Sequence, residues 1–133
     1  MNHLIILSAI LLSGIFANAE THPATYRYVI QFNSQCCGVP DAAPLMNAIQ
    51  VFRKKNKLKK ITYFIISPMG REGEYHMAFP LTEMSKKQTS LFIKQMDLLT
   101  ETLKDKGSAT TEENMVIDQS TLSSRTTIIK KMI

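Results

Sequence analysis

The sequence contains little of what would mark an unusual protein class. Its 133 residues include only five glycines, five prolines and two cysteines, while 44% are hydrophobic and 20% are charged. This composition excludes collagen-like, low-complexity and intrinsically disordered chains. After residue 19, no apolar run approaches the length of about 18 residues that a membrane-spanning helix needs. The sequence therefore predicts a folded protein without a membrane span.

Catalytic signatures are also missing. The chain has no Ser-His-Asp order, no glycine-rich phosphate loop, no HExxH motif and no paired acids placed for acid-base work. These absences favour a binding protein over an enzyme. A thiol enzyme built on the two cysteines stays open as an alternative.

The N-terminal segment has the features of an export signal. Leu4 to Ala17 form an apolar run of 14 residues, which is too short to cross a bilayer, and Ala17-Asn18-Ala19 has the small-x-small form of a signal-peptidase site. We predict that residues 1–19 are a cleaved signal peptide and that residues 20–133 form a single small domain. The expected location is the periplasm or the extracellular space.

Hydrophobic periodicity predicts an alternation of strands and helices after the signal. Strands are expected over residues 26–33, 60–67 and 74–79, the last two forming a hairpin. Helices are expected from Asp41 to about Asn56 and from Thr82 or Ser85 to Gly107. Residues 107–133 are rich in serine and threonine, and one or two strands are expected there, at 115–117 and 126–133.

The order of these elements predicts the fold. The pattern β-α-β-β-α-β is that of the ferredoxin-like sandwich, an α+β fold in which two helices cover one face of a four-stranded antiparallel sheet. Tyr26, Tyr28, Ile30 and Phe32 are expected to share the face toward the core. His76 falls on the opposite face of its strand, so we expect it to be exposed or to contact a partner.

Positive charge is concentrated in one short segment. The chain carries 16 Lys and Arg against 11 Asp and Glu, a net charge of +5. Six of the cations lie within eight residues, without an acid among them: Arg53, Lys54, Lys55, Lys57, Lys59 and Lys60. They form either a solvated helix C-terminus or a binding patch for an anionic ligand or a protein partner. Nucleic acid is an unlikely partner, because no aromatic residue is interleaved to stack on bases.

The two cysteines, Cys36 and Cys37, are adjacent and lie between the first expected strand and the first expected helix. Their position resembles that of the metal-binding loop in heavy-metal-associated domains, which share this order of strands and helices. Those domains bind soft metals through two cysteines separated by two residues, so their ligand geometry does not transfer to an adjacent pair. A vicinal disulfide, a disulfide to another chain and free thiols all remain open.

A soft-metal or thiol-redox role is thus the alternative to a binding function. Cys36 and Cys37 would supply thiolates to copper or zinc, and His76, Met69 and Met77 are candidates for further ligands, although their spacing does not fix them nearby. The main hypothesis requires no cofactor. It is a small, basic, exported domain that binds an unknown protein or anionic ligand.

Overall fold

The computed structural model describes residues 23–133, and the predicted signal peptide lies outside this range. The described chain contains five strands, two α-helices and one short 3-10 helix. In order they are β1 (Ala24–Ser34), α1 (Ala43–Lys55), β2 (Thr62–Ser67), β3 (Tyr75–Phe79), α2 (Lys86–Thr100), β4 (Gly107–Ile117), η1 (Gln119–Thr121) and β5 (Thr127–Met132). No helix in this range is long and apolar enough to cross a membrane.

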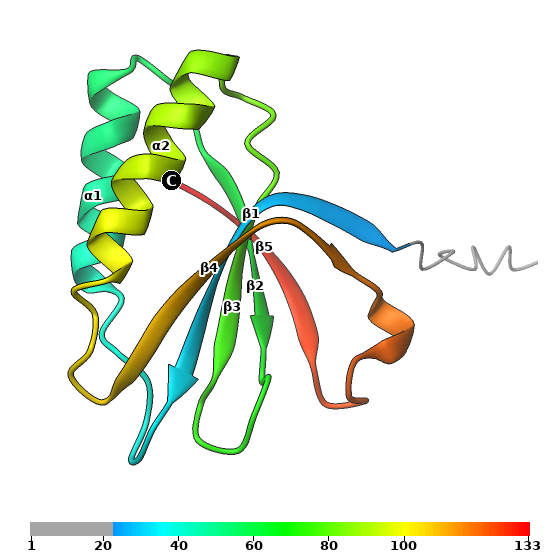
Figure 1. The fold of residues 1–133 in the computed structure, drawn as a ribbon. Helices are drawn as coiled ribbons and strands as arrows, with labels where there is room; N and C mark the ends of the chain where they lie inside the picture. The colour runs from blue at the N-terminus through cyan, green and yellow to red at the C-terminus, as the bar shows by residue number, and fades with distance from the viewer. Residues whose placement is uncertain (1–22) are drawn as a thin grey trace, which may run out of the picture.

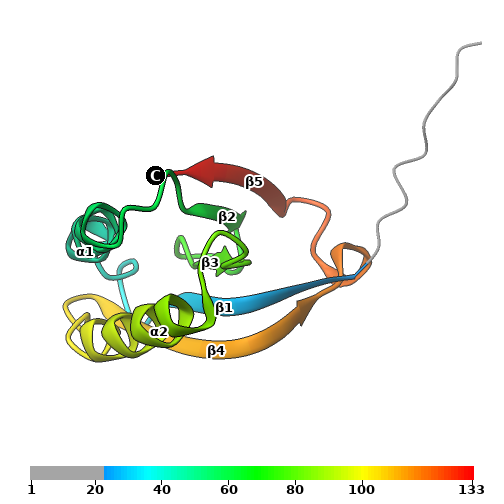
Figure 2. The same cartoon turned by 90° about the horizontal axis from the view of Figure 1, so that it is seen from above.

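The strands form one antiparallel sheet in the order β4-β1-β3-β2-β5, and both helices lie against the same face of it (Figures 1 and 2). The predicted α+β class is therefore confirmed. The four-stranded ferredoxin-like sandwich is not, because the sheet has a fifth strand beside β2. Residues 107–133, where one or two strands were expected, contain an 11-residue strand, a 3-10 turn and a second strand, and the first of these strands is longer than predicted.

The main core lies between the helices and the sheet. Phe92 of α2 is at its centre, with its ring edge-on to Phe52 of α1 at 5.2 Å and to Tyr28 of β1 at 6.1 Å. Leu45, Ile49 and Phe52 of α1 recur at helical spacing and are all buried. Aromatic pairs at such angles add to the stabilisation that burial provides.

The helix ends follow local chemistry only in part. The Ser85 hydroxyl accepts from the Gln88 backbone N–H while the Gln88 side chain accepts from the Ser85 N–H, which confirms the predicted capping box of α2. The prediction that α2 reaches Gly107 was wrong, because the helix ends at Thr100. Gly107 instead opens β4, where a Cβ would overlap the Asn33 carbonyl oxygen.

The face of the sheet away from the helices carries a second, smaller apolar cluster. Its buried members are Tyr26, Val29, Ile66, Ala78 and Ile117. Residues 118–126 connect the two outermost strands, and Leu122 within this segment packs on the cluster. Both faces of the sheet are therefore partly covered.

Two predictions about side chains on this face were wrong, one of direction and one of exposure. Tyr26 packs here, 5.4 Å from the ring of Phe64, and not with Tyr28 in the main core. The alternation of β1 breaks at Arg27, opposite Asn114, whose backbone has a φ of 55°. His76, expected to be exposed, is only 7% exposed, because this face is not open to solvent as a simple two-layer sandwich would leave it.

Candidate functional site

The predicted basic segment lies at the C-terminal end of α1 and in the turn to β2. Five of its six cations are exposed: Lys54, Lys55, Lys57, Lys59 and Lys60. Arg53 differs, because its Nη1 donates hydrogen bonds to the carbonyl oxygens of Leu58 at 3.5 Å and Lys59 at 3.3 Å. Arg53 therefore closes the turn, and the lysines are the groups that a ligand could reach.

Folding adds four lysines that the sequence analysis missed. The Gln88 side chain donates to the Asn56 carbonyl oxygen at 3.3 Å, which brings the first turn of α2, with Lys86 and Lys87, to the end of α1 (Figure 1). Lys130 and Lys131 of β5 pair with Phe64 and Tyr63 near the start of β2 and, as consecutive strand residues, point to opposite faces of the sheet at this edge. The only signal in the sequence was that each pair is two consecutive lysines.

We call these nine exposed lysines the basic end: Lys54, Lys55, Lys57, Lys59, Lys60, Lys86, Lys87, Lys130 and Lys131. None of them pairs with an acid within residues 23–133, where the one ion pair joins Arg27 to Glu113 at 3.1 Å. Like charges held together without partners create a positive potential that attracts anions.

One carboxylate lies within the basic end. Glu83 lines a hollow of about 350 Å³ together with Lys57, Lys59 and Lys60. Its Oε1 accepts hydrogen bonds from the Thr62 backbone N–H at 3.2 Å and from the Thr62 hydroxyl. Glu83 is therefore held by the start of β2, and it offsets only one of the nine positive charges.

A larger groove of about 780 Å³ runs along α2 and joins the basic end at Lys86. Its walls include the apolar side chains of Leu81, Met84, Ile93 and Leu98, and Leu98 is 60% exposed. An exposed leucine in a concave surface with charged neighbours is typical of contact surfaces for other proteins.

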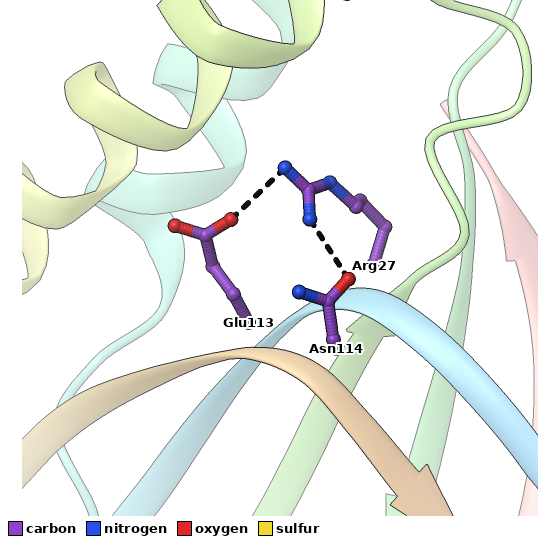
Figure 3. Close-up of polar contacts among 3 residues, drawn as sticks. All are labelled: Arg27, Glu113 and Asn114. Carbon is purple, nitrogen blue, oxygen red and sulfur yellow. Dashed lines mark hydrogen bonds and ion pairs between the residues drawn. The ribbon is translucent and has the colours of Figure 1, made fainter.

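Arg27 and Glu113, which line this groove, form a polar cluster with Asn114 (Figure 3). Arg27 Nη2 contacts Glu113 Oε2 at 3.1 Å, and Arg27 Nη1 donates to Asn114 Oδ1 at 2.8 Å. The break in β1 turns Arg27 toward α2, on the same side as Tyr28. Because Arg27 is already neutralised, it shapes the groove more than it attracts a ligand.

Two tyrosines with raised pKa values, Tyr28 and Tyr75, offer no general base. The Tyr28 hydroxyl donates to Asp97 Oδ1 at 2.8 Å. Burial raises the pKa of Tyr28 far above its usual value, and the Asp97 carboxylate raises it further. Burial, with a smaller effect of Asp41, also raises the pKa of Tyr75 to about 12. Both phenols are protonated at neutral pH and act as structural groups.

The cysteine loop is exposed. Cys36 and Cys37 are both free thiols on the surface, and Cys37 has a φ of 67°, next to Gly38 with a φ of 117°. The structure does not bring them together with His76: within residues 23–133, no three His, Cys, Asp or Glu side chains gather closely enough to hold a metal ion. The alternative of a shared copper or zinc site gains no geometric support.

His76 faces a different set of groups. It lines a cavity of about 130 Å³ on the second face of the sheet, together with Met69 and Met115. Its Nδ1 is buried and has no hydrogen-bond partner among the described residues. Burial lowers the pKa of His76, and the weaker field of Glu112 opposes this shift, so the imidazole is neutral at pH 7. Met77, the other predicted ligand, lies in the main core.

Comparison with known proteins gives no relative. No protein-family model matches the chain, and no curated protein or solved structure shows significant similarity to it.

Proposed function

We propose that this protein is an exported, non-enzymatic binding domain whose basic end holds an acidic protein partner. The observation that carries the proposal is the gathering of nine exposed lysines from α1, α2, β5 and the turn before β2, without an ion pair to any acid within residues 23–133. Self-repulsion at such a surface is relieved when an anionic partner covers it.

The groove along α2 supports a protein partner over a polysaccharide. It begins at Lys86 of the basic end and continues past Met84, Ile93 and Leu98. A sulfated or phosphorylated glycan has no apolar groups to place against these side chains. An acidic protein segment can set its carboxylates on the lysines and its apolar side chains in the groove.

The order of the first four strands in the sheet, β4-β1-β3-β2, supports a finer proposal about the fold. We infer a ferredoxin-like unit of four strands and two helices to which β5 has been added. The addition matters for binding, because β5 contributes Lys130 and Lys131 to the basic end.

Charge reversal tests the proposal. Lys55→Glu/Lys57→Glu/Lys59→Glu changes the net charge by −6, from +5 to −1. We expect this variant to bind a fluorescent peptide of alternating Glu and Leu about tenfold more weakly, since each lost surface ion pair is worth about 0.5 kcal/mol. Added salt should weaken the wild-type complex in the same way. Fluorescence anisotropy measures both effects.

A matched control separates the basic end from net charge. Lys104→Glu/Lys106→Glu/Arg125→Glu changes the charge equally at exposed positions outside the basic end. We expect it to retain most of the affinity. If both variants lost the same affinity for the Glu-Leu peptide, binding would depend on net charge alone, and this result would contradict a specific site.

The groove has its own test. A peptide of alternating Glu and Gly has the same charge but no apolar side chains, so we expect it to bind more weakly than the Glu-Leu peptide. Leu98→Ser should remove this difference without changing binding of the Glu-Gly peptide. If heparin binds as tightly as the Glu-Leu peptide and Leu98→Ser has no effect, the partner is a polyanion and the protein assignment is wrong.

A further inference from the structure

His76 is unusual among the buried residues of the sheet. It is 7% exposed, and its Nδ1 has no hydrogen-bond partner within the described chain. Leaving a buried polar atom unpaired is energetically unfavourable, so such atoms call for an explanation, often a bound water or ion. His76 lines a cavity together with Met69 and Met115, which we call the His76 cavity. This cavity offers space for such a bound species next to the imidazole.

The strand register brings these three residues together from separate elements. His76 is on β3, where it pairs with Ile66 of β2 and Gln31 of β1. Met69 follows β2 in the hairpin loop, and its backbone N–H donates to the Glu74 carbonyl oxygen at 2.8 Å. Met115 comes from β4, just after the bend at Asn114.

Met115 is also held in place. The Gln31 side-chain amide donates to the Met115 sulfur at 3.8 Å, and Gln31 is the register partner of His76. A methionine that only fills space is flexible and needs no such contact. The Met115 thioether, a soft sulfur ligand, and the His76 imidazole, a nitrogen ligand, therefore line the same cavity.

We propose that the His76 cavity binds a monovalent soft metal ion, Cu(I), through the His76 imidazole and the Met69 and Met115 thioethers. Thioether ligands select Cu(I) over harder ions, and imidazole suits copper as well. The three ligands are neutral, and most of the remaining lining is apolar, with Asp118 and Thr121 as its polar members. An ion of single charge is less costly than a divalent ion to bury in such surroundings.

One further observation agrees with this site. Asp118 lines the cavity, and its Oδ1 accepts from the Ser120 N–H at 2.9 Å and from the Ser120 hydroxyl at 2.7 Å, so its carboxylate supplies negative charge beside the ion.

The test uses Ag⁺, a redox-stable ion with the same soft character, added as the nitrate to protein with Cys36→Ser and Cys37→Ser. These substitutions remove the exposed thiols, which would bind the ion more tightly. We expect saturation at one equivalent, with shifts in the methyl NMR signals of Met69 and Met115 but not of Met132. Cu(I), kept reduced by ascorbate without oxygen, should compete for the same site.

Conservative variants decide the assignment. Met69→Leu and Met115→Leu preserve the side-chain volume and should keep the fold, but each should raise the Kd for Ag⁺ at least tenfold. Met132→Leu, at an exposed methionine, is the matched control and should leave the Kd unchanged. No saturable binding, or binding that neither Met69→Leu nor Met115→Leu weakens, would overturn the proposal. It stands apart from the anion-binding proposal, which uses none of these residues.

Discussion

At Gly107 the chain passes close to the backbone of β1. The residue pairs with Ser34, and a Cβ there would overlap the Asn33 carbonyl oxygen, which cannot move without breaking the strand pairing. We expect Gly107→Ala to lower the free energy of unfolding by about 1–3 kcal/mol, as overpacking does elsewhere. Urea denaturation measures this change. Ser108→Ala, one residue further along, is the control, and equal midpoints for the two variants would contradict the steric account.

Individual residues also show where the sequence could not predict direction. Leu45, Ile49 and Phe52 follow the helical period, and their burial was predictable. Tyr26 follows the same alternation as Tyr28 but faces the opposite way, because the bend opposite Asn114 interrupts the period of two. A backbone distortion that depends on a distant strand leaves no mark in the local pattern.

At the scale of single elements, the N-terminus of α2 depends on its capping box. Ser85→Ala removes the hydroxyl that accepts from the Gln88 N–H at 3.2 Å. We expect a loss of about 1 kcal/mol in stability, measured as a lower midpoint of thermal or urea unfolding. Ser90→Ala, at an exposed position inside the same helix, should be neutral or slightly stabilising because alanine is the better helix former. A loss at Ser90 as large as that at Ser85 would rule out capping as the cause.

Element ends were predictable where a specific side chain sets them and not elsewhere. Ser85 and Gln88 marked the start of α2 correctly, whereas no residue type marks its end at Thr100, and Leu103 continues the apolar pattern into the core beyond the helix. β4 was missed over most of its length because its outward side chains are serine, threonine and glutamate. An outermost strand buries little, so its composition resembles that of a loop.

The whole sheet should unfold unevenly. β1 and β3 each pair with neighbours on both sides, while β5 pairs with β2 alone and has mostly exposed side chains. We expect amide hydrogen exchange, followed by NMR, to be slowest in β1 and β3 and to be markedly faster in β5. Exchange in β5 as slow as in β1 would mean that the fifth strand opens only when the entire domain unfolds.

The candidate sites also become visible only in the folded molecule. The charge of segment 53–60 is visible in the sequence. A helix contact and a strand register bring four more lysines to it only in the folded protein: Lys86, Lys87, Lys130 and Lys131. Met69, His76 and Met115 are separated by up to 46 residues, and no spacing rule connects them. The sequence could therefore predict the α+β class and the first part of the basic end, and little of the second face.

The bend at Asn114 has a consequence for how copies of this protein behave together. β4 is the longest strand with one unpaired side, and a straight strand of 11 residues would offer a template for intermolecular pairing and fibril growth. The positive φ of Asn114 breaks that template into two short runs, and the adjacent Glu112 and Glu113 add charge to it. The distortion that turns Arg27 toward α2 thereby also shortens the straight edge that a second copy could pair with.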